Sequence, residues 1–97
     1  MDKDAKILQE MGNAVIDLQV KYRNSTLSDR VSLKPTLEEL LNDYAKYQLR
    51  LLKEGVITTD EDLQEMAKIR AEIDEAAQKQ SLLKAIARTV AFVATKI

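Results

Sequence analysis

The sequence predicts an all-α fold, in which a single domain spanning residues 1–97 contains three main helices. Glycine occurs only twice and proline once, while 45% of the residues are hydrophobic, so turn formers are scarce and apolar helix formers dominate. Apolar residues also recur at steps of three and four along most of the chain, which is the spacing of one helix face. A chain of 97 residues buries only a modest core unless it finds partners.

The first helix is expected from Asp2 to about Arg23. Its apolar face is marked by Leu8, Met11, Val15, Leu18 and Tyr22. Gly12 lies inside this helix, where glycine costs roughly 1 kcal/mol relative to alanine. We interpret Gly12 as a point of close contact with a neighbouring helix rather than as a kink.

The segment from Asn24 to Pro35 is predicted as a packed loop that contains one short helical turn, because polar residues alternate there with Leu27, Val31 and Leu33. The second helix is expected to begin after Pro35, where Thr36 followed by Glu39 fits a capping box. Its apolar residues form a broad stripe that must be covered from more than one side. They are Leu37, Leu40, Leu41, Tyr44, Tyr47, Leu51 and Leu52.

A tight corner is predicted in residues 51–62, which read LLKEGVITTDED. Gly55 suits the left-handed residue that closes many helices, and Val56 or Ile57 can pack back onto the last turn. Thr58 or Thr59 would cap the next helix, and the acidic residues 60–62 would complement its positive end. We therefore expect the second and third helices to form a helical hairpin.

The segment Leu49–Arg70 resembles the short helical hairpin of the SHOCT domain family. The resemblance rests on a leucine-rich helix, a glycine, an Ile-Thr pair, acidic residues and a lysine, at Leu49, Leu52, Gly55, Ile57, Thr58, Asp60, Glu61 and Lys68. It covers about a quarter of the chain and implies a role in oligomerisation. The chain departs from the family at Leu63, where an aromatic residue is usual, and in continuing for nearly thirty residues beyond the hairpin.

The third helix is expected to run to Ile97, because nine of the ten positions spaced by three and four from residue 66 to the end are apolar. A continuous or slightly kinked helix is favoured. The alternative is a break near Gln78–Ser81, where Ser81 could cap a new helix ahead of Leu82.

The last sixteen residues, Leu82–Ile97, are largely apolar around the helix, so most of their surface requires a dry neighbour. That neighbour can be the first two helices or the same helix of another chain. We expect a contact between chains formed by Met66, Ile69, Ile73, Leu83, Ile86, Val90, Phe92, Val93 and Ile97.

Charge is unevenly distributed along the third helix. Residues 60–75 contain seven acidic and two basic side chains, whereas residues 76–97 contain four basic and no acidic ones. An antiparallel partner segment, in the same or another chain, would bring opposite charges together. The basic residues beside an apolar face also leave binding to a membrane surface as an alternative. A membrane span is disfavoured, because the segment is too short and includes Lys84 and Arg88.

The residues that most often carry enzyme chemistry are missing. The chain has no histidine and no cysteine, which removes the commonest general base, nucleophile and metal ligands. The carboxylate pairs Glu61/Glu65 and Glu72/Glu75 lack the histidines of a helical-bundle metal site. We therefore expect no enzyme activity, no cofactor and no metal.

These observations predict a non-catalytic protein–protein interaction module, such as a small adaptor, inhibitor or assembly factor, that forms a homodimer through its C-terminal helix. A net charge of −1 disfavours nucleic acid in general. Weak nucleic-acid contact is left as an alternative through Lys21, Arg23, Arg30 and Lys34. The N-terminus is charged where a secretory signal would be apolar, so we expect a cytoplasmic protein.

Overall fold

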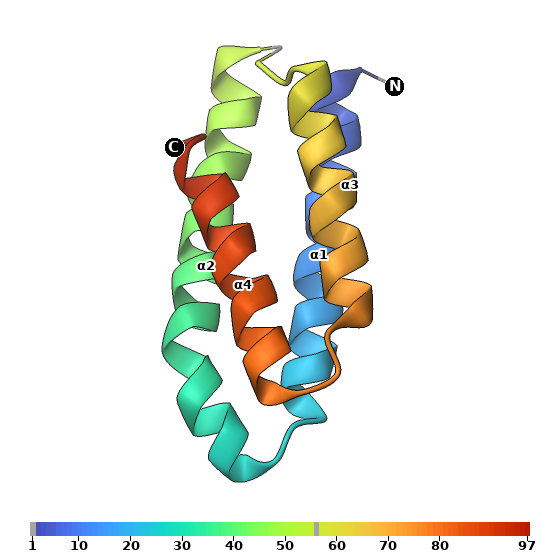
Figure 1. The fold of residues 1–97 in the computed structure, drawn as a ribbon. Coiled ribbons are helices and arrows are strands. Elements are labelled where there is room, and N and C mark those ends of the chain that lie inside the picture. Colours follow the sequence, from blue (N-terminus) through green and yellow to red (C-terminus); the bar gives the residue numbers. More distant parts are fainter. Residues whose placement is uncertain (1, 56) are drawn as a thin grey trace.

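The computed structural model describes residues 2–55 and 57–97, and these form a bundle of four helices in two layers (Figure 1). The helices are α1 (Lys3–Arg23), α2 (Leu27–Glu54), α3 (Asp60–Glu75) and α4 (Lys79–Ala94). Helices α1 and α2 form one layer, and α3 and α4 form the other. The all-α prediction is confirmed, but the described part of the chain has four helices where three were predicted.

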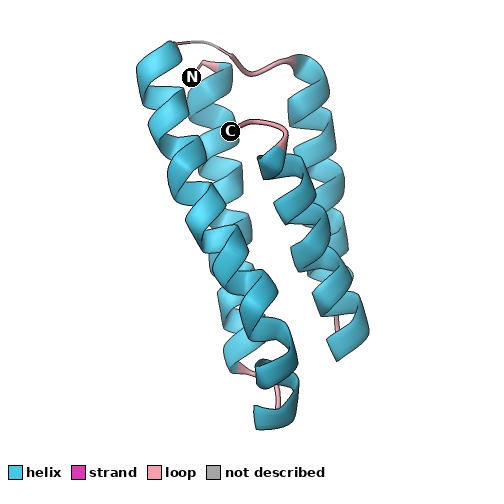
Figure 2. Cartoon of the chain, turned by 90° about the vertical axis from the view of Figure 1, so that its left-hand side faces the viewer, coloured by secondary structure: helices cyan, strands magenta, loops and turns pink. Residues whose placement is uncertain are grey.

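Successive helices run in opposite directions, yet they do not all pack side by side. The main packing pairs are α2 with α4 and α1 with α3. Within the described residues, α2 and α3 do not pack against each other, because they lie at diagonal corners and their connecting loop crosses the end of the bundle (Figure 2). The expected hairpin of the second and third helices is therefore wrong. The broad apolar stripe of α2 is covered mainly by α4.

Helix α1 agrees with its prediction to within one residue. Asp2 caps it by accepting a hydrogen bond from the amide of Ala5 at 2.7 Å. The helix continues through Gly12 without a break. A Cβ added to Gly12 would lie 3.1 Å from the hydroxyl oxygen of Tyr44 in α2. Gly12 is thus the point of close helix contact that the sequence indicated.

Helix α2 begins at Leu27, nine residues earlier than the start predicted at Thr36, so the loop prediction for this segment is wrong. Thr26 caps the helix by accepting a hydrogen bond from the amide of Asp29 at 3.1 Å. Pro35 lies inside the helix, where it removes one backbone donor. The helix continues past it because Leu33 before it and Leu37 after it are both buried in the core.

The corner between α2 and α3 agrees with its sequence in having a positive φ at Gly55 and a threonine cap, but Gly55 does not adopt the left-handed helical conformation that was predicted. Gly55 has φ 76° and ψ −151°, a backbone region that essentially only glycine adopts. Thr59 and Asp62 form a reciprocal capping box, with both hydrogen bonds at 3.1 Å. The role suggested for Val56 lies outside the described residues, whereas Ile57 is partly buried against the core.

The continuous third helix is also wrong, because the chain turns back between Glu75 and Lys79. The alternative break near Gln78–Ser81 was closer to the observed structure. Ser81 stabilises the start of α4 from inside the helix, where its Oγ accepts a hydrogen bond from the amide of Gln78 at 3.1 Å. By doubling back, the chain buries the apolar faces of both α3 and α4 in one core.

Candidate functional site

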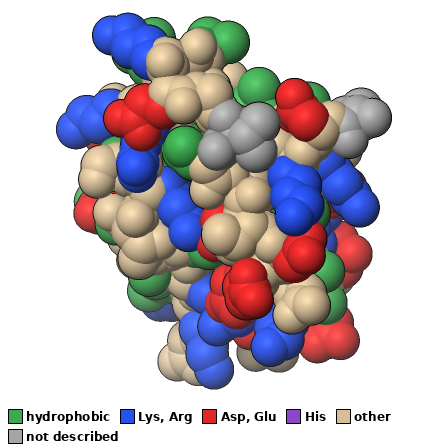
Figure 3. Space-filling model, turned by 90° about the horizontal axis from the view of Figure 1, so that it is seen from above, with side chains coloured by type: hydrophobic (Ala, Val, Ile, Leu, Met, Phe, Trp, Pro, Cys, Tyr) green, Lys and Arg blue, Asp and Glu red, His purple; other side chains and the backbone are tan. Residues whose placement is uncertain are grey.

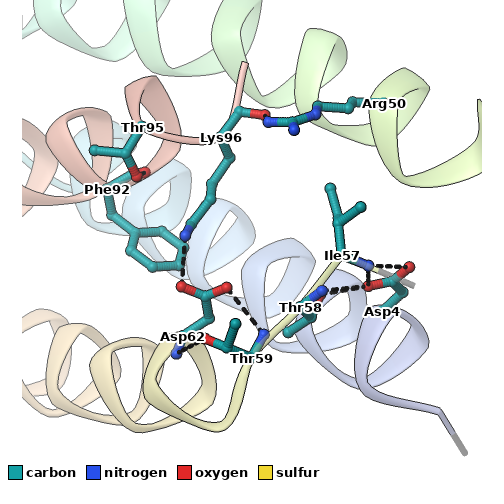
Figure 4. Close-up of polar contacts among 9 residues, drawn as sticks. All are labelled: Asp4, Arg50, Ile57, Thr58, Thr59, Asp62, Phe92, Thr95 and Lys96. Carbon is teal, nitrogen blue, oxygen red and sulfur yellow. Dashed lines mark hydrogen bonds and ion pairs between the residues drawn. The ribbon is translucent and has the colours of Figure 1, made fainter. Parts of the chain in front are cut away.

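A polar cluster closes the end of the bundle where the α2–α3 loop lies, and Asp4 is its first anchor (Figure 4). Asp4 is buried at the start of α1. Its Oδ1 accepts hydrogen bonds from the amides of Ile57 at 3.1 Å and Thr58 at 3.0 Å, and from the Thr58 hydroxyl. A carboxylate oxygen can accept several hydrogen bonds at once, and such bonds are stronger than those between neutral groups. Asp4 therefore fixes the loop over the end of the bundle.

The second anchor joins α3 to the end of the chain. Lys96 donates a hydrogen bond from Nζ to Oδ1 of Asp62 at 2.5 Å, and the same Nζ lies 5.3 Å from the centre of the Phe92 ring. Arg50 of α2 donates to the backbone carbonyl of Lys96. Together with Asp4, these contacts join all four helices. Seen from this end, acidic and basic side chains lie next to one another (Figure 3).

In this cluster, the pKa of Asp62 is lowered and the pKa of Tyr47 is raised, so both lie further from neutral pH than usual. Burial alone would raise the pKa of Asp62, but hydrogen bonds from Lys96 and Thr59 and the charge of Lys96 outweigh it, so the pKa is lowered. Burial, with a smaller effect of the Asp62 charge, raises the pKa of Tyr47 to about 12. Neither group exchanges a proton readily near pH 7, and this suits a stabilising role better than acid–base catalysis.

A groove of about 430 Å³ lies between α3 and α4 and is lined by charged residues of both helices. Arg88 pairs with Glu65 at 2.6 Å and with Glu72 at 3.0 Å. The acidic segment 60–75 and the basic segment 76–97 are therefore antiparallel neighbours within one chain. Their opposite charges pair with each other, as the charge distribution in the sequence suggested. No group of three or more potential metal-ligating side chains is found in residues 2–55 and 57–97.

The structure brings most of the predicted interface residues together, but inside the chain's own core. Met66, Ile69 and Ile73 of α3 are buried there, as are Ile86, Val90, Phe92 and Val93 of α4. Leu83 is partly buried against the core, whereas Ile97 is 46% exposed. A contact between chains through the buried residues would require the bundle to open.

Most of the large apolar side chains that remain exposed belong to α1 and α2. Among the described residues they are Ile16, Val20, Leu27, Val31, Leu49, Leu52 and Ile97. All except Ile97 belong to α1 or α2. We call these six residues and the outer surface between them the α1/α2 face. Helical spacing places Ile16 and Val20 on the side of α1 opposite its buried residues.

Sequence reasoning missed this face for two reasons. Leu27 and Val31 were expected in a packed loop, and the extra turns of α2 expose them on a helix surface instead. Leu52 was included in the buried stripe of the second helix, yet it is 78% exposed. One signal was present in the sequence, because Ile16 and Val20 fall off the apolar face of the first helix.

The basic residues considered for nucleic acid or membranes are partly engaged within the chain. Lys21 donates a hydrogen bond to the carbonyl of Ala76 at 2.8 Å, near the end of α3. Lys34 pairs with Glu38 at 3.8 Å, and Lys96 pairs with Asp62. In the described part of the chain, no helix is both long enough and apolar enough to span a membrane.

Comparison with known proteins found no match: no protein-family model, no curated protein and no solved structure matches this chain. The likeness of Leu49–Arg70 to the SHOCT hairpin therefore depends on its residues alone. The structure differs from that expectation, because α2 and α3 lie at diagonal corners of the bundle.

Proposed function

We propose that this chain is a non-catalytic protein-interaction module that binds its partner through the α1/α2 face. The observation that carries the proposal is the uneven exposure of apolar side chains. Six of the seven large apolar side chains exposed in the described residues lie on α1 and α2. A concentration of exposed apolar residues on one side of a small protein is typical of a binding surface.

The arrangement of these residues on α2 supports the proposal. Val31 and Leu49 are 18 residues apart, which is five full turns of about 3.6 residues, so they project in the same direction. Leu27 and Leu52 lie about 40° to 60° to one side of that direction, given about 100° per residue. Leu27 is 71% exposed, Val31 69% and Leu49 55%. The four therefore lie on one side of α2, with one pair near each end of the helix.

Covering these four side chains with a partner would contribute a large free energy of binding for so small a protein. Full burial of a leucine or valine side chain contributes about 1.5–3 kcal/mol. The layer of α3 and α4 would gain much less free energy from being covered. In the described residues, these two helices expose no large apolar side chain and carry paired charges instead. The asymmetry favours docking through α1 and α2.

The structure gives less support to the two alternative functions, which are binding to a membrane surface and binding to nucleic acid. The apolar face of α4 is buried in the core, so a membrane surface would have to compete with α2 for it. Lys21 and Lys34, two of the residues considered for nucleic acid, already bind other groups in the chain. A cytoplasmic location remains part of the proposal.

Affinity capture from the native cell tests the proposal, with charges introduced on each layer in turn. The variant Leu49→Glu/Leu52→Glu places two carboxylates on the α1/α2 face. The matched control Ala71→Glu/Ala87→Glu places two on exposed positions of α3 and α4. Circular dichroism confirms that each variant is folded. We expect the first variant to lose partners that the control retains. Equal retention by both would overturn the proposal.

A further inference from the structure

We propose that the partner on the α1/α2 face is a second copy of this chain, docked so that the two α2 helices run antiparallel. This inference rests on the proposed function and specifies its partner. Three features of the face support it, namely the order of side chains along α2, their charges and the length over which they extend.

One stripe of α2 consists of eight exposed positions spaced by three or four residues: Leu27, Val31, Lys34, Glu38, Asn42, Ala45, Leu49 and Leu52. This is the spacing of a helix that pairs with another helix. The stripe is apolar at both ends and polar or small in the middle. A stripe of this kind is complementary to itself when it is reversed.

Reversal about a point between Glu39 and Leu40 matches every position of the stripe with another. Leu27 then lies opposite Leu52 of the second copy, and Val31 lies opposite Leu49. In the middle, Lys34 lies opposite Ala45, and Glu38 lies opposite Asn42. A two-fold interface requires such reciprocal pairs, because each contact occurs twice.

Charge selects the antiparallel orientation over the parallel one. In a parallel pair, Lys34 would face Lys34 of the second copy and Glu38 would face Glu38, and like charges opposed in an interface are unfavourable. In the antiparallel pair, each of these charges faces a neutral side chain. Each also keeps its partner within its own chain, since Lys34 and Glu38 form an ion pair at 3.8 Å.

The stripe is long enough to pack along a second helix. From Leu27 to Leu52 it advances by 25 residues, roughly 37 Å at 1.5 Å per residue, and the bundle itself is 41 Å long. Interfaces of standard size bury about 800 Å² on each partner, so the contact would also include side chains beside the stripe. On the neighbouring helix α1, Ile16 is 57% exposed and Val20 is 41% exposed. No opening of the core is needed, in contrast to a dimer formed through α4.

Complementary charge substitutions at one expected contact test both the partner and the orientation. Leu27→Lys and Leu52→Glu are made in separate chains. In a homodimer of either variant, two charges face leucines, and we expect the dissociation constant to rise on the order of 100-fold. In a mixed dimer, the introduced lysine faces the introduced glutamate at one contact, and the two native leucines face each other at the other. Sedimentation velocity should therefore show dimer in the mixture and monomer in each variant alone.

Cysteine cross-linking provides an independent measure of the orientation, since the chain has no native cysteine. Val31→Cys and Leu49→Cys should form an oxidised heterodimer when mixed. Neither variant alone should cross-link, because positions 31 and 49 are separated by roughly 27 Å along α2. Cross-linking of either variant with itself would instead indicate parallel helices and would overturn the antiparallel arrangement.

These experiments distinguish failure of the second-copy inference from failure of the proposed function and from failure of the antiparallel pairing. A wild-type chain that remains monomeric at all concentrations overturns the second-copy inference, yet the proposed function stands if Leu49→Glu/Leu52→Glu still loses a different captured protein. A wild-type dimer that neither single variant weakens shows that the dimer uses another surface and overturns the second-copy inference. The proposed function is then also overturned if Leu49→Glu/Leu52→Glu retains every captured protein. A dimer that both variants weaken but that mixing does not restore overturns the antiparallel pairing alone.

Discussion

The hydroxyl oxygen of Tyr44 in α2 lies 3.1 Å from the position that a Cβ at Gly12 of α1 would occupy. This contact is the close approach of the two helices that carry the α1/α2 face. It explains why a residue that weakens a helix stands in the middle of α1. A side chain at position 12 would press on the end of the tyrosine ring.

Gly12→Ala should therefore stabilise the fold more when the Tyr44 hydroxyl is absent. In the Tyr44→Phe background, alanine should gain about 1 kcal/mol from its better helix propensity. In the wild-type background, part of that gain is lost because the ring must shift. Urea unfolding of the four chains of a double-mutant cycle measures the difference. Equal effects of Gly12→Ala in both backgrounds would contradict this account of the contact.

Gly55→Ala should destabilise the fold, in contrast to alanine at Gly12. The backbone at Gly55 lies in a region where other residues are strained, at a cost of about 1–3 kcal/mol. No heavy atom lies within 4 Å of a Cβ built there, so the expected cost comes from the backbone and not from a steric clash. Thermal unfolding measures it, with the exposed Lys53→Ala as the control. A melting temperature no lower than that of the control would refute the assignment.

Local signals in the sequence predicted several local features, because neighbouring residues largely determine them, although the capping box at Thr36 wrongly placed the start of α2. The glycine at the α2–α3 corner, the Thr59 cap and the extent of α1 were predicted on this basis. The packing of α2 against α4 instead of α3 depends on which apolar faces fit together across the bundle. Helical spacing alone does not say which helices pack together. The apolar spacing also continues through the turn before Lys79, so it gave no sign that the helix ends there.

The Asp62–Lys96 contact should make stability depend on pH in the acid range. The pKa of Asp62 in the folded state is below its ordinary value of 3.8, because hydrogen bonds from Lys96 and Thr59 outweigh the opposing effect of burial. Its contribution is therefore fully present above pH 3.8 and is lost as the pH falls through the lowered value. Hydrogen bonds to a charged group contribute about 1.5–3 kcal/mol each.

Asp62→Asn should accordingly lower the free energy of unfolding at pH 7 and should have a smaller effect at acid pH. Urea titrations at pH 7 and below pH 4 measure the difference from wild type at each pH. The exposed Glu61→Gln, one residue earlier in α3, is the matched control and should show little change. A difference between Asp62→Asn and wild type that stays constant with pH would argue against the ion pair.

Val93→Asp should unfold the chain, because Val93 is fully buried in the core. An unpaired charge there, together with the lost packing, should cost more than about 4 kcal/mol. Circular dichroism should show a loss of helix, whereas the exposed neighbour Ala94→Asp should remain folded. A folded Val93→Asp chain of reduced mass would instead support the original expectation that α4 forms a contact between chains.

The proposed binding surface was less predictable than the fold. The sequence indicated an excess of apolar side chains, and the C-terminal helix was the most apolar segment. In the structure, that same apolarity makes α4 a core element, and the less apolar helices α1 and α2 are left with exposed residues. Exposure depends on how the four helices are placed. The helical spacing of the sequence therefore could not distinguish the exposed Leu49 and Leu52 from buried leucines.

The most direct test of the α1/α2 face is the mass of the chain in solution, measured by light scattering over a range of concentrations. We predict that the wild type and Ala71→Glu/Ala87→Glu reach twice the chain mass of 11.0 kDa, whereas Leu49→Glu/Leu52→Glu remains at 11.0 kDa while keeping its helical spectrum. The same mass for all three chains, whether monomer or dimer, would contradict self-association through this face.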